Sequence, residues 1–250
     1  MKDPLITKRD VARELARKYS TMTHDELDLL EDILVPMKFA KGQMVLNEGE
    51  VCKGFYYIDR GLMRQFYEKH GKEMTEHIAE DHTIVMCIES LFREEPTRLK
   101  VEALENTVAY MLPKAELERV ALHNVNIQIL YRKILEESLI QSQVHADLVR
   151  FETALDRYKR LCKLMPQVVL RAPLVYIASY LQMTPETLSR VRASLLNERK
   201  QNKNALNKKN NRPVKIKAIC GMLLPLQGDV CLQCLINAGA KDGGAYTHYG

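Results

Sequence analysis

Glu186 and Arg190 are the two side chains of this 250-residue chain whose types and spacing point most directly to a chemistry. Positions four residues apart on an α-helix differ by about 40° around the axis, so both side chains would project from one face. An arginine guanidinium can contact O6 and N7 of guanine together, and a carboxylate can accept a hydrogen bond from N4 of cytosine. The pair therefore fits the edges of paired DNA bases, provided that a helix carries it into a major groove.

Residues 171–196 predict two short helices joined by a tight turn. The first runs from Pro173 to Leu181 and opens with a proline, where the missing N–H costs nothing. The second opens with Thr184-Pro185-Glu186, which supplies a capping hydroxyl, a residue suited to the first turn and a negative charge at the positive end of the helix dipole. One buried apolar set is expected at helical spacing: Val175, Ile177, Ala178, Leu181, Met183, Leu188, Val191 and Leu195.

This layout is typical of a helix-turn-helix whose second helix enters the major groove. The alternative is a helix-turn-helix that serves only for packing, with Glu186 and Arg190 as a solvent-facing pair. A capped start and a polar face occur together here, and this combination favours a helix-turn-helix that binds nucleic acid.

The segment MTPETLSR, Met183 to Arg190, resembles the recognition helix of the Crp/Fnr transcription factors. In that family the helix carries an R-E-x-x-x-R pattern in which the Glu and the second Arg read base edges. Glu186 and Arg190 match those two positions, whereas Pro185 stands in place of the first Arg, so the resemblance implies an operator unlike the family's best-known site. It also implies phosphate or base-edge hydrogen bonds from Thr184, Thr187 and Ser189.

The charge distribution supports a polyanionic partner for the second half of the chain. Residues 157–217 hold fifteen Lys or Arg against Glu186 and Glu198, a net charge of +13, whereas residues 1–156 carry −7. Lys200, Lys203, Lys208 and Lys209 would add attraction that is independent of base sequence. Charge alone fits RNA or an anionic surface equally well, and the helix-turn-helix decides for double-stranded DNA.

Residues 37–112 consist of short β-like runs separated by glycines and charged turns, with glycines at 42, 49, 54, 61 and 71. This stretch resembles the effector-binding β-roll of the same family, a jelly-roll-like sandwich with one internal cavity. The matching segments are Gly42-Gln43, Glu48-Gly49-Glu50, Phe55-Tyr56-Tyr57-Ile58 and Arg60-Gly61.

Helical patterns flank the β-like region on both sides. Residues 3–34 are expected to be helical, with a capping box formed by Thr23 and Glu26. Residues 114–148 are again helical, and one heptad phase joins Ile127, Ile134, Leu148 and Leu155, with Gln141 interrupting it and Leu130 and Val144 on the adjoining row. We expect an imperfect coiled-coil seam that forms a homodimer; the alternative is a helix packed only on its own domain.

A hinge is expected at residues 149–152. The next helix would pass through Thr153, Leu155, Tyr158, Leu161 and Leu164 and end before Pro166. After Leu196 the chain becomes rich in Asn and Lys, which predicts a basic linker followed by a poorly ordered tail.

Family members that bind cyclic AMP hold its phosphate with a Gly-Glu pair and a later Arg-Ser or Arg-Thr pair. The corresponding candidates here are Glu89 and Arg98, but Ile88 precedes the first and Leu99 follows the second. The sequence therefore favours an unidentified effector, or none, over a cyclic nucleotide.

Other cofactors and catalysis find little support in the sequence. No cysteine precedes Cys52, which argues against the family's iron–sulfur cluster, and Cys220, Cys231, Cys234 and His248 lack a second close pair that would favour zinc. His77, Glu80 and His82 lie near one another but lack the His-x-His spacing of a metal-binding β-roll, and His77 and Glu80 would face opposite sides of a strand. No nucleophile–base motif or phosphate loop is present. We expect no enzyme.

The sequence thus predicts an α+β fold: a cyclic-nucleotide-binding-type β-roll with its N-terminal helix (1–113), a dimerisation helix (114–150), a winged-helix-like helix-turn-helix domain (151–199) and a basic tail (200–250). No apolar run approaches the length of a membrane span, and no signal peptide is visible, so the expected location is cytoplasmic. The expected function is a homodimeric regulator on a pseudo-palindromic operator, with RNA polymerase as a further partner. The alternative is a sensor protein that regulates a protein partner without specific DNA binding.

Overall fold

Residues 35–113 form two antiparallel four-stranded sheets in a computed structural model that describes residues 7–210, and side chains only for residues 7–197. The order in the first sheet is β1 (Val35–Phe39), β8 (Thr107–Pro113), β3 (Gly54–Arg60), β6 (Ile84–Val85). The order in the second is β2 (Met44–Leu46), β7 (Lys100–Ala103), β4 (Met63–Lys69), β5 (Lys72–Ala79). Two facing sheets of this kind form a jelly-roll-like sandwich, as the glycine-punctuated pattern predicts.

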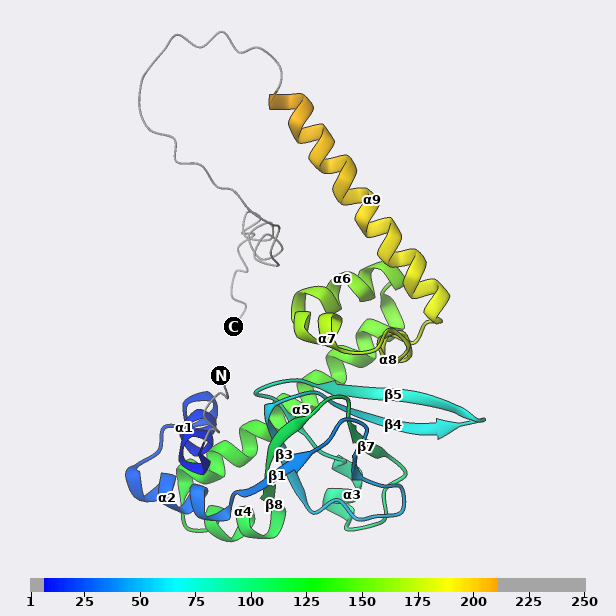
Figure 1. Ribbon diagram of the computed structural model, residues 1–250. Helices are drawn as coiled ribbons and strands as arrows, with labels where there is room; N and C mark the ends of the chain where they lie inside the picture. The colour runs from blue at the N-terminus through cyan, green and yellow to red at the C-terminus, as the bar shows by residue number, and fades with distance from the viewer. Residues whose placement is uncertain (1–6, 211–250) are drawn as a thin grey trace, which may run out of the picture.

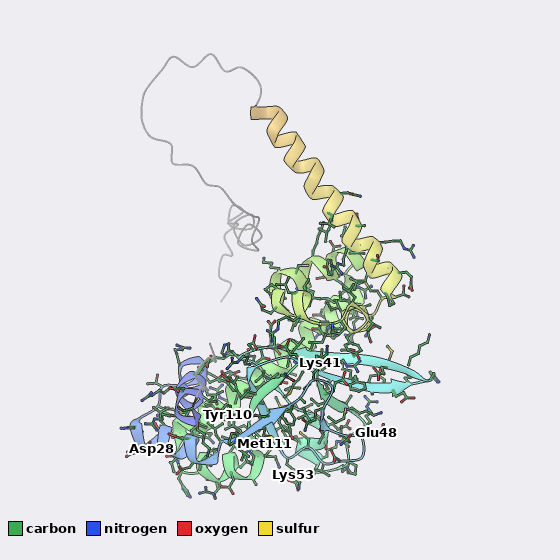
Figure 2. The ribbon with its side chains drawn as sticks, viewed as in Figure 1. Asp28, Lys41, Glu48, Lys53, Tyr110 and Met111 are labelled. Carbon is green, nitrogen blue, oxygen red and sulfur yellow. The ribbon has the colours of Figure 1, made fainter. Side chains whose placement is uncertain are left out.

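The labels in Figure 2 help to locate the roll. Tyr110 and Met111 lie on β8, Lys41 and Glu48 lie in the turns on either side of β2, and Lys53 directly precedes β3. The longest ladder joins β4 to β5, a ribbon that Figure 1 shows extending beyond the rest of the roll.

Gly61, between β3 and β4, combines a positive φ with a close packing contact. Its φ of +132° is rarely adopted by other residues, and a Cβ there would lie 2.3 Å from Thr107 Oγ1. Its N–H donates to Asp81 Oδ1 at 2.6 Å, so the turn also fixes a carboxylate beside β5.

Helices α1 (Lys8–Tyr19) and α2 (His24–Ile33) precede the roll. The capping box of Thr23 and Glu26 is confirmed, and Thr7 forms a second box with Asp10. Because Thr23 starts a new helix, residues 3–34 are not one continuous helix. Val11, Leu15 and Tyr19 of α1 join the core of the roll.

Helices α3 (Ile88–Arg93), α4 (Lys114–Ala121) and α5 (Val125–Phe151) complete the first half of the chain. The first half of α5 packs on the roll, and Figure 1 shows the helix continuing from there to the second group of helices. Among the described residues no helix is both long and apolar enough to span a bilayer.

The second group contains α6 (Ala154–Leu164), α7 (Pro166–Arg171), α8 (Leu174–Tyr180) and α9 (Pro185–Asn210). A hinge is predicted at residues 149–152, and the helix is interrupted there: α5 ends at Phe151, and the Thr153 hydroxyl accepts the N–H of Asp156 at the start of α6. Movement about this point stays a prediction. The prediction that the basic linker begins at residue 200 is wrong for residues 200–210, which extend α9. No Gly or Pro interrupts this stretch, and its Lys, Gln, Ala and Leu residues favour helix. Residues 211–250 lie outside the description.

Candidate nucleic-acid interface

The turn between α8 and α9 fixes how the candidate recognition helix leaves the domain. Gln182 N–H donates to Ser179 O at 3.0 Å, and Met183 N–H donates to Ala178 O at 2.9 Å, so the last turn of α8 closes in the manner of a Schellman motif. Gln182 has a φ of +49°, the left-handed region that glycine adopts at no steric cost.

The predicted cap of α9 is present. Thr184 Oγ1 accepts the N–H of Thr187 at 3.2 Å, and Pro185 is the first residue of the helix. Hydrogen bonding to Thr184 lowers the pKa of the Glu186 carboxyl, and the charge of Arg190 lowers it further. Glu186 is therefore an acceptor at neutral pH, close enough to Arg190 for their charges to interact.

The face of α9 that carries these two residues is open to solvent. Thr184, Glu186, Ser189 and Arg190 are exposed, Thr187 is partly buried, and Leu188 on the opposite side is 1% exposed. The described part of the chain thus leaves the candidate base-reading side chains uncovered. Their contact with DNA stays a prediction.

The apolar set behind this face differs from the prediction at one position. Ile177, Ala178, Leu181 and Leu188 are buried, and three further members, Met183, Val191 and Leu195, pack against them. Val175 is 53% exposed, so its inclusion in the buried set is wrong. Tyr180 is also buried in this cluster, although it was not a member of the expected apolar set.

Arg157 is a supporting residue that sequence reasoning missed. From α6 its Nη1 donates to Leu181 O at 2.6 Å and to Gln182 O at 3.5 Å, the two carbonyls of the turn. Its partners are backbone atoms 24 and 25 residues away, which no local pattern reveals.

The helix-turn-helix domain is docked on the second sheet of its own roll, which the sequence did not predict. Thr75 N–H of β5 donates to Ser179 Oγ of α8 at 2.8 Å, and Val168 N–H donates to Glu80 Oε2 at 3.2 Å. Arg171 pairs with both Asp81 and Glu105. Helix α8 therefore lies along β5, while α9 projects away from the roll (Figure 1).

Arg64 of β4 is the largest buried polar side chain at this contact, with 1% exposure. Its guanidinium lies 3.6 Å from the ring centroid of Tyr176 in α8 and 3.8 Å from that of Phe66. Nη2 also pairs with Glu73 at 2.8 Å and Glu102 at 2.7 Å. Stacking and ion pairing offset part of the cost of burying this charge, while Nε and Nη1 are buried without a hydrogen-bond partner in the described residues.

The predicted dimer seam is buried within the chain. Ile127, Leu130 and Ile134 belong to the core of the roll, and Leu148 packs with the helix-turn-helix domain, so this seam is not available to a second copy. Further along α5, Ile140 is 61% exposed, Val144 39% and Phe151 80%. At about 100° per residue these three lie within about 40° of one another on a stripe next to the buried one.

The predicted effector residues have separate partners. Glu89 is exposed and pairs with Arg93 at 3.6 Å, one turn along α3. Arg98 is 4.0 Å from Glu76 and lies over the Tyr67 ring at 5.5 Å. The structure shows no shared partner for Glu89 and Arg98 among the described residues, and their role in ligand binding stays untested.

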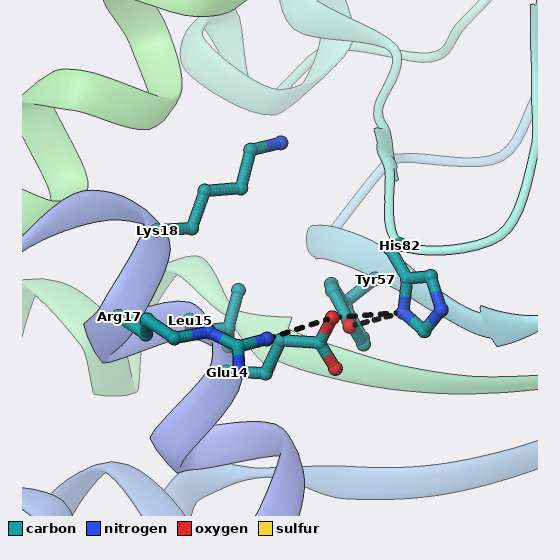
Figure 3. Close-up of a pocket in the computed structure, with 6 residues that line it drawn as sticks. All are labelled: Glu14, Leu15, Arg17, Lys18, Tyr57 and His82. Carbon is teal, nitrogen blue, oxygen red and sulfur yellow. Dashed lines mark hydrogen bonds and ion pairs between the residues drawn. The ribbon is translucent and has the colours of Figure 1, made fainter. Parts of the chain in front are cut away.

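An open pocket of about 270 Å³ lies between α1 and the roll, and neither Glu89 nor Arg98 lines it. His82 Nδ1 is 2.9 Å from a carboxylate oxygen of Glu14 and 3.1 Å from the hydroxyl of Tyr57 (Figure 3). Arg17 and Lys18 line the same pocket. This mixture of charges was not singled out in the sequence.

Inside the roll, hydrogen bonding is incomplete: both carboxylate oxygens of Asp59 and Thr75 Oγ1 are buried without a partner in the described part of the chain. The Gln65 amide donates to Met86 O and to Cys87 Sγ, each at 3.3 Å, and Cys52 and Cys87 are buried free thiols. Within residues 7–197 no group of three or more His, Cys, Asp or Glu side chains could hold a metal ion. Cys220, Cys231, Cys234 and His248 lie outside the described residues.

Comparison with known proteins agrees with this architecture. Residues 36–124 match the family model of the cyclic nucleotide-binding domain. A curated relative, the anaerobic regulatory protein of Bacillus subtilis, is 29% identical over 127 residues, which are 49% of this chain and 53% of the relative. The match therefore spans about half the length of that relative.

Solved structures with the same fold include FixK2 from Bradyrhizobium japonicum, at 19% identity and a TM-score of 0.55, covering 66% of this chain and 86% of FixK2. A protein described as a Crp/Fnr family transcriptional regulator from Eubacterium rectale has 15% identity and a TM-score of 0.53, covering 71% of this chain and 85% of its own.

The fold and the domain match define a class of protein in which a cyclic nucleotide-binding-type sensor domain is joined by a long helix to a helix-turn-helix domain. The expected resemblance to the Crp/Fnr regulators is confirmed at the level of the fold: residues 36–124 match the cyclic nucleotide-binding domain, and the chain shares its fold with a solved structure described as a Crp/Fnr family regulator.

Proposed function

We propose that the protein is a sequence-specific DNA-binding regulator of transcription. The chain would insert α9 into a major groove, where Glu186 and Arg190 read base edges and Thr184, Thr187 and Ser189 supply further hydrogen bonds. RNA polymerase is a further partner in this proposal, and no catalytic step is involved.

One observation carries the proposal more than any other. A hydroxyl cap, a closed turn and the Arg157 contact hold the start of α9, and the exposed side of that start presents a carboxylate and a guanidinium one turn apart. This support would restrict the directions in which the two side chains can point, and direct base readout requires such restriction.

We infer that the active form is a homodimer built on the exposed stripe of Ile140, Val144 and Phe151. A helix-turn-helix dimer reads two half-sites about 34 Å apart, so its operator would be pseudo-palindromic. The stripe lies on the half of α5 nearest the helix-turn-helix domain, which suits a dimer that sets the spacing of the two recognition helices.

The sensor domain would adjust this dimer in response to a small effector. Cyclic nucleotide-binding is the property of the matched domain family, but Ile88 and Leu99 replace the residues expected beside Glu89 and Arg98. We therefore propose an effector of another kind, or regulation without one.

Selection of bound duplexes from a random pool, using the full chain, tests the function. The proposal expects enrichment of one motif with two inverted half-sites, one helical turn apart. Retention of DNA without any enriched motif, or no retention at low salt, would contradict it and would favour a sensor that acts on a protein partner.

A further inference from the structure

Two histidines meet where the roll, α5 and the helix-turn-helix domain come together. His77 lies on β5 and His145 on α5, close enough for their charges to interact. The His145 ring stacks on Tyr180 of α8, with centroids 4.4 Å apart and an interplanar angle of 18°. Helices α5 and α8 thus meet at one aromatic contact, and β5, which carries His77, packs against α8.

Both imidazoles are held in the neutral form. Burial lowers the pKa of His77 to about 4, and repulsion from His145 contributes to this shift. Burial also lowers the pKa of His145, and its Nδ1 is a buried atom without a hydrogen-bond partner in the described part of the protein.

The neighbouring elements offer these rings little compensating charge. On β4, Gln65 is the register partner of His77, and Arg64 is already engaged by Glu73 and Glu102. Tyr180 has its pKa raised to about 12 by burial, so it is neutral.

The acidic groups of the surrounding elements are engaged elsewhere. Glu76 faces Arg98, Glu80 accepts from Val168 N–H, and Asp147 of α5 accepts from Gln143. Asp81 and Glu105 are paired with Arg171. If either histidine took up a proton, none of these carboxylates would be free to form an ion pair with it.

We propose that His77 and His145 form an acid-responsive joint: when both take up protons, the junction opens and the helix-turn-helix domain separates from the sheet of β4 and β5. Two imidazolium ions close enough for their charges to interact repel each other, and burial leaves them poorly hydrated. The contacts expected to open first are those beside them, Thr75 N–H to Ser179 Oγ and the Ser179 hydroxyl to Glu73 O.

The direction of the pH effect follows from the lowered pKa values. A histidine that is neutral in the closed joint and ordinary in the open one favours closure above pH 6.5, and this preference is lost as the pH falls from 6.5 toward 4. For His77 alone the opening equilibrium rises roughly tenfold between pH 7.5 and 5.5. His145 increases the response further.

Amide hydrogen exchange on the full chain without DNA tests the joint directly. After correction for the intrinsic pH dependence of exchange, residues 72–79 and 174–181 should lose protection at least tenfold between pH 7.5 and 5.5, whereas α1 should not. Protection of both segments that is equal at the two pH values would overturn the proposal.

A neutral double variant, His77→Gln with His145→Phe, keeps a ring against Tyr180 and should lose the response. His123→Gln removes an exposed histidine between α4 and α5 and should keep it. A full response in the double variant would overturn the proposal.

If the double variant fails to fold, an NMR titration of the His77 ring in the unmodified protein still tests the proposal. A pKa near 6.5 would count against the joint, and one at least a unit lower would support it. Neither measurement involves DNA, so the joint can fail while the proposed function holds, and the reverse is also possible.

Discussion

Arg171 of α7 pairs with Asp81, which follows β5, and this contact joins the helix-turn-helix domain to the roll across 90 residues of sequence. The side chains are 21% and 27% exposed. Gly61 N–H donates to the same carboxylate, and Glu105 also pairs with the guanidinium. Asp81 of the roll is thus held in place and forms an ion pair with Arg171 of the candidate DNA-binding domain.

Removing this cation should loosen the docked arrangement. We expect Arg171→Gln to lower the free energy of unfolding by about 1–3 kcal/mol, because it leaves two partly buried carboxylates with poorer partners. Urea unfolding at pH 7 measures the change. Arg132→Gln is the matched control, since its ion pair with Glu136 is exposed and should cost less than about 1 kcal/mol. Equal effects of the two substitutions would contradict a role for Arg171 in docking.

The same pair predicts a dependence on acid. Burial raises the pKa of Asp81, but the hydrogen bonds and charge of Arg171 and the Gly61 N–H outweigh burial, so the net pKa is lowered. The stabilisation is therefore complete above the ordinary aspartate pKa of about 3.9 and is lost as the pH falls through the lower, folded value. Unfolding curves between pH 5 and 3 should be less steeply pH-dependent for Arg171→Gln than for the unmodified protein. Identical slopes would show that the shift does not arise from this pair.

Gln182 offers a test of the turn between α8 and α9. A residue with a side chain at a φ of +49° carries a penalty that glycine lacks, so Gln182→Gly should stabilise the protein by up to about 1 kcal/mol. Gln143→Gly within α5 should destabilise it by about 1 kcal/mol, since glycine is unfavourable in a helix interior. Thermal unfolding of both variants measures the contrast. Destabilisation by Gln182→Gly would mean that the side chain, not the backbone, matters at the turn.

The exposed stripe of α5 predicts the oligomeric state. Ile140→Glu should shift a dimer to monomer at micromolar concentration in sedimentation and should weaken operator binding, because a charge would be buried in the interface. Ser142→Glu lies about 200° around the helix from Ile140 and should leave the dimer intact. A monomer for the unmodified protein, with and without DNA, would refute the dimer.

Basic residues after the recognition segment should act without base preference. Replacing Lys200, Lys203, Lys208 and Lys209 together with Gln should weaken binding to selected and random duplexes to a similar extent. The plot of log affinity against log salt should also become flatter, because fewer counterions are released. Binding isotherms at several salt concentrations measure both effects. A loss confined to the selected duplex would contradict this role.

Local signals made the helix-turn-helix predictable. Its caps and breaks are encoded by neighbouring residues, such as Thr184 with Pro185 and Thr153 at the start of α6, and the same holds for Thr23 with Glu26 at the start of α2. The turn-rich β pattern of residues 37–112 also identified the roll, since glycines such as Gly61 occupy backbone conformations that other residues rarely adopt.

Contacts between distant segments were not predictable in the same way. A heptad pattern does not show whether its apolar residues pack on the roll of the same chain or on a second copy. Ile127 and Ile134 were therefore assigned to a dimer interface, although they pack on the roll. Val175 and the docking of Arg64 on Tyr176 depend on which face of α8 meets β5, and helical period alone does not fix that face. The extension of α9 to Asn210 shows that a polar composition rich in Asn and Lys does not by itself end a helix.

Quantitative binding of Arg190→Ala to the duplex selected by the unmodified protein tests the central claim most directly. The variant should lose about 1–3 kcal/mol of binding free energy on that duplex, with relaxed preference at one base pair and little change on random DNA. Arg119→Ala on α4 removes the same charge far from α9 and should leave both affinities unchanged. Equal losses on selected and random duplexes for Arg190→Ala would show that this guanidinium contributes charge alone and does not read a base.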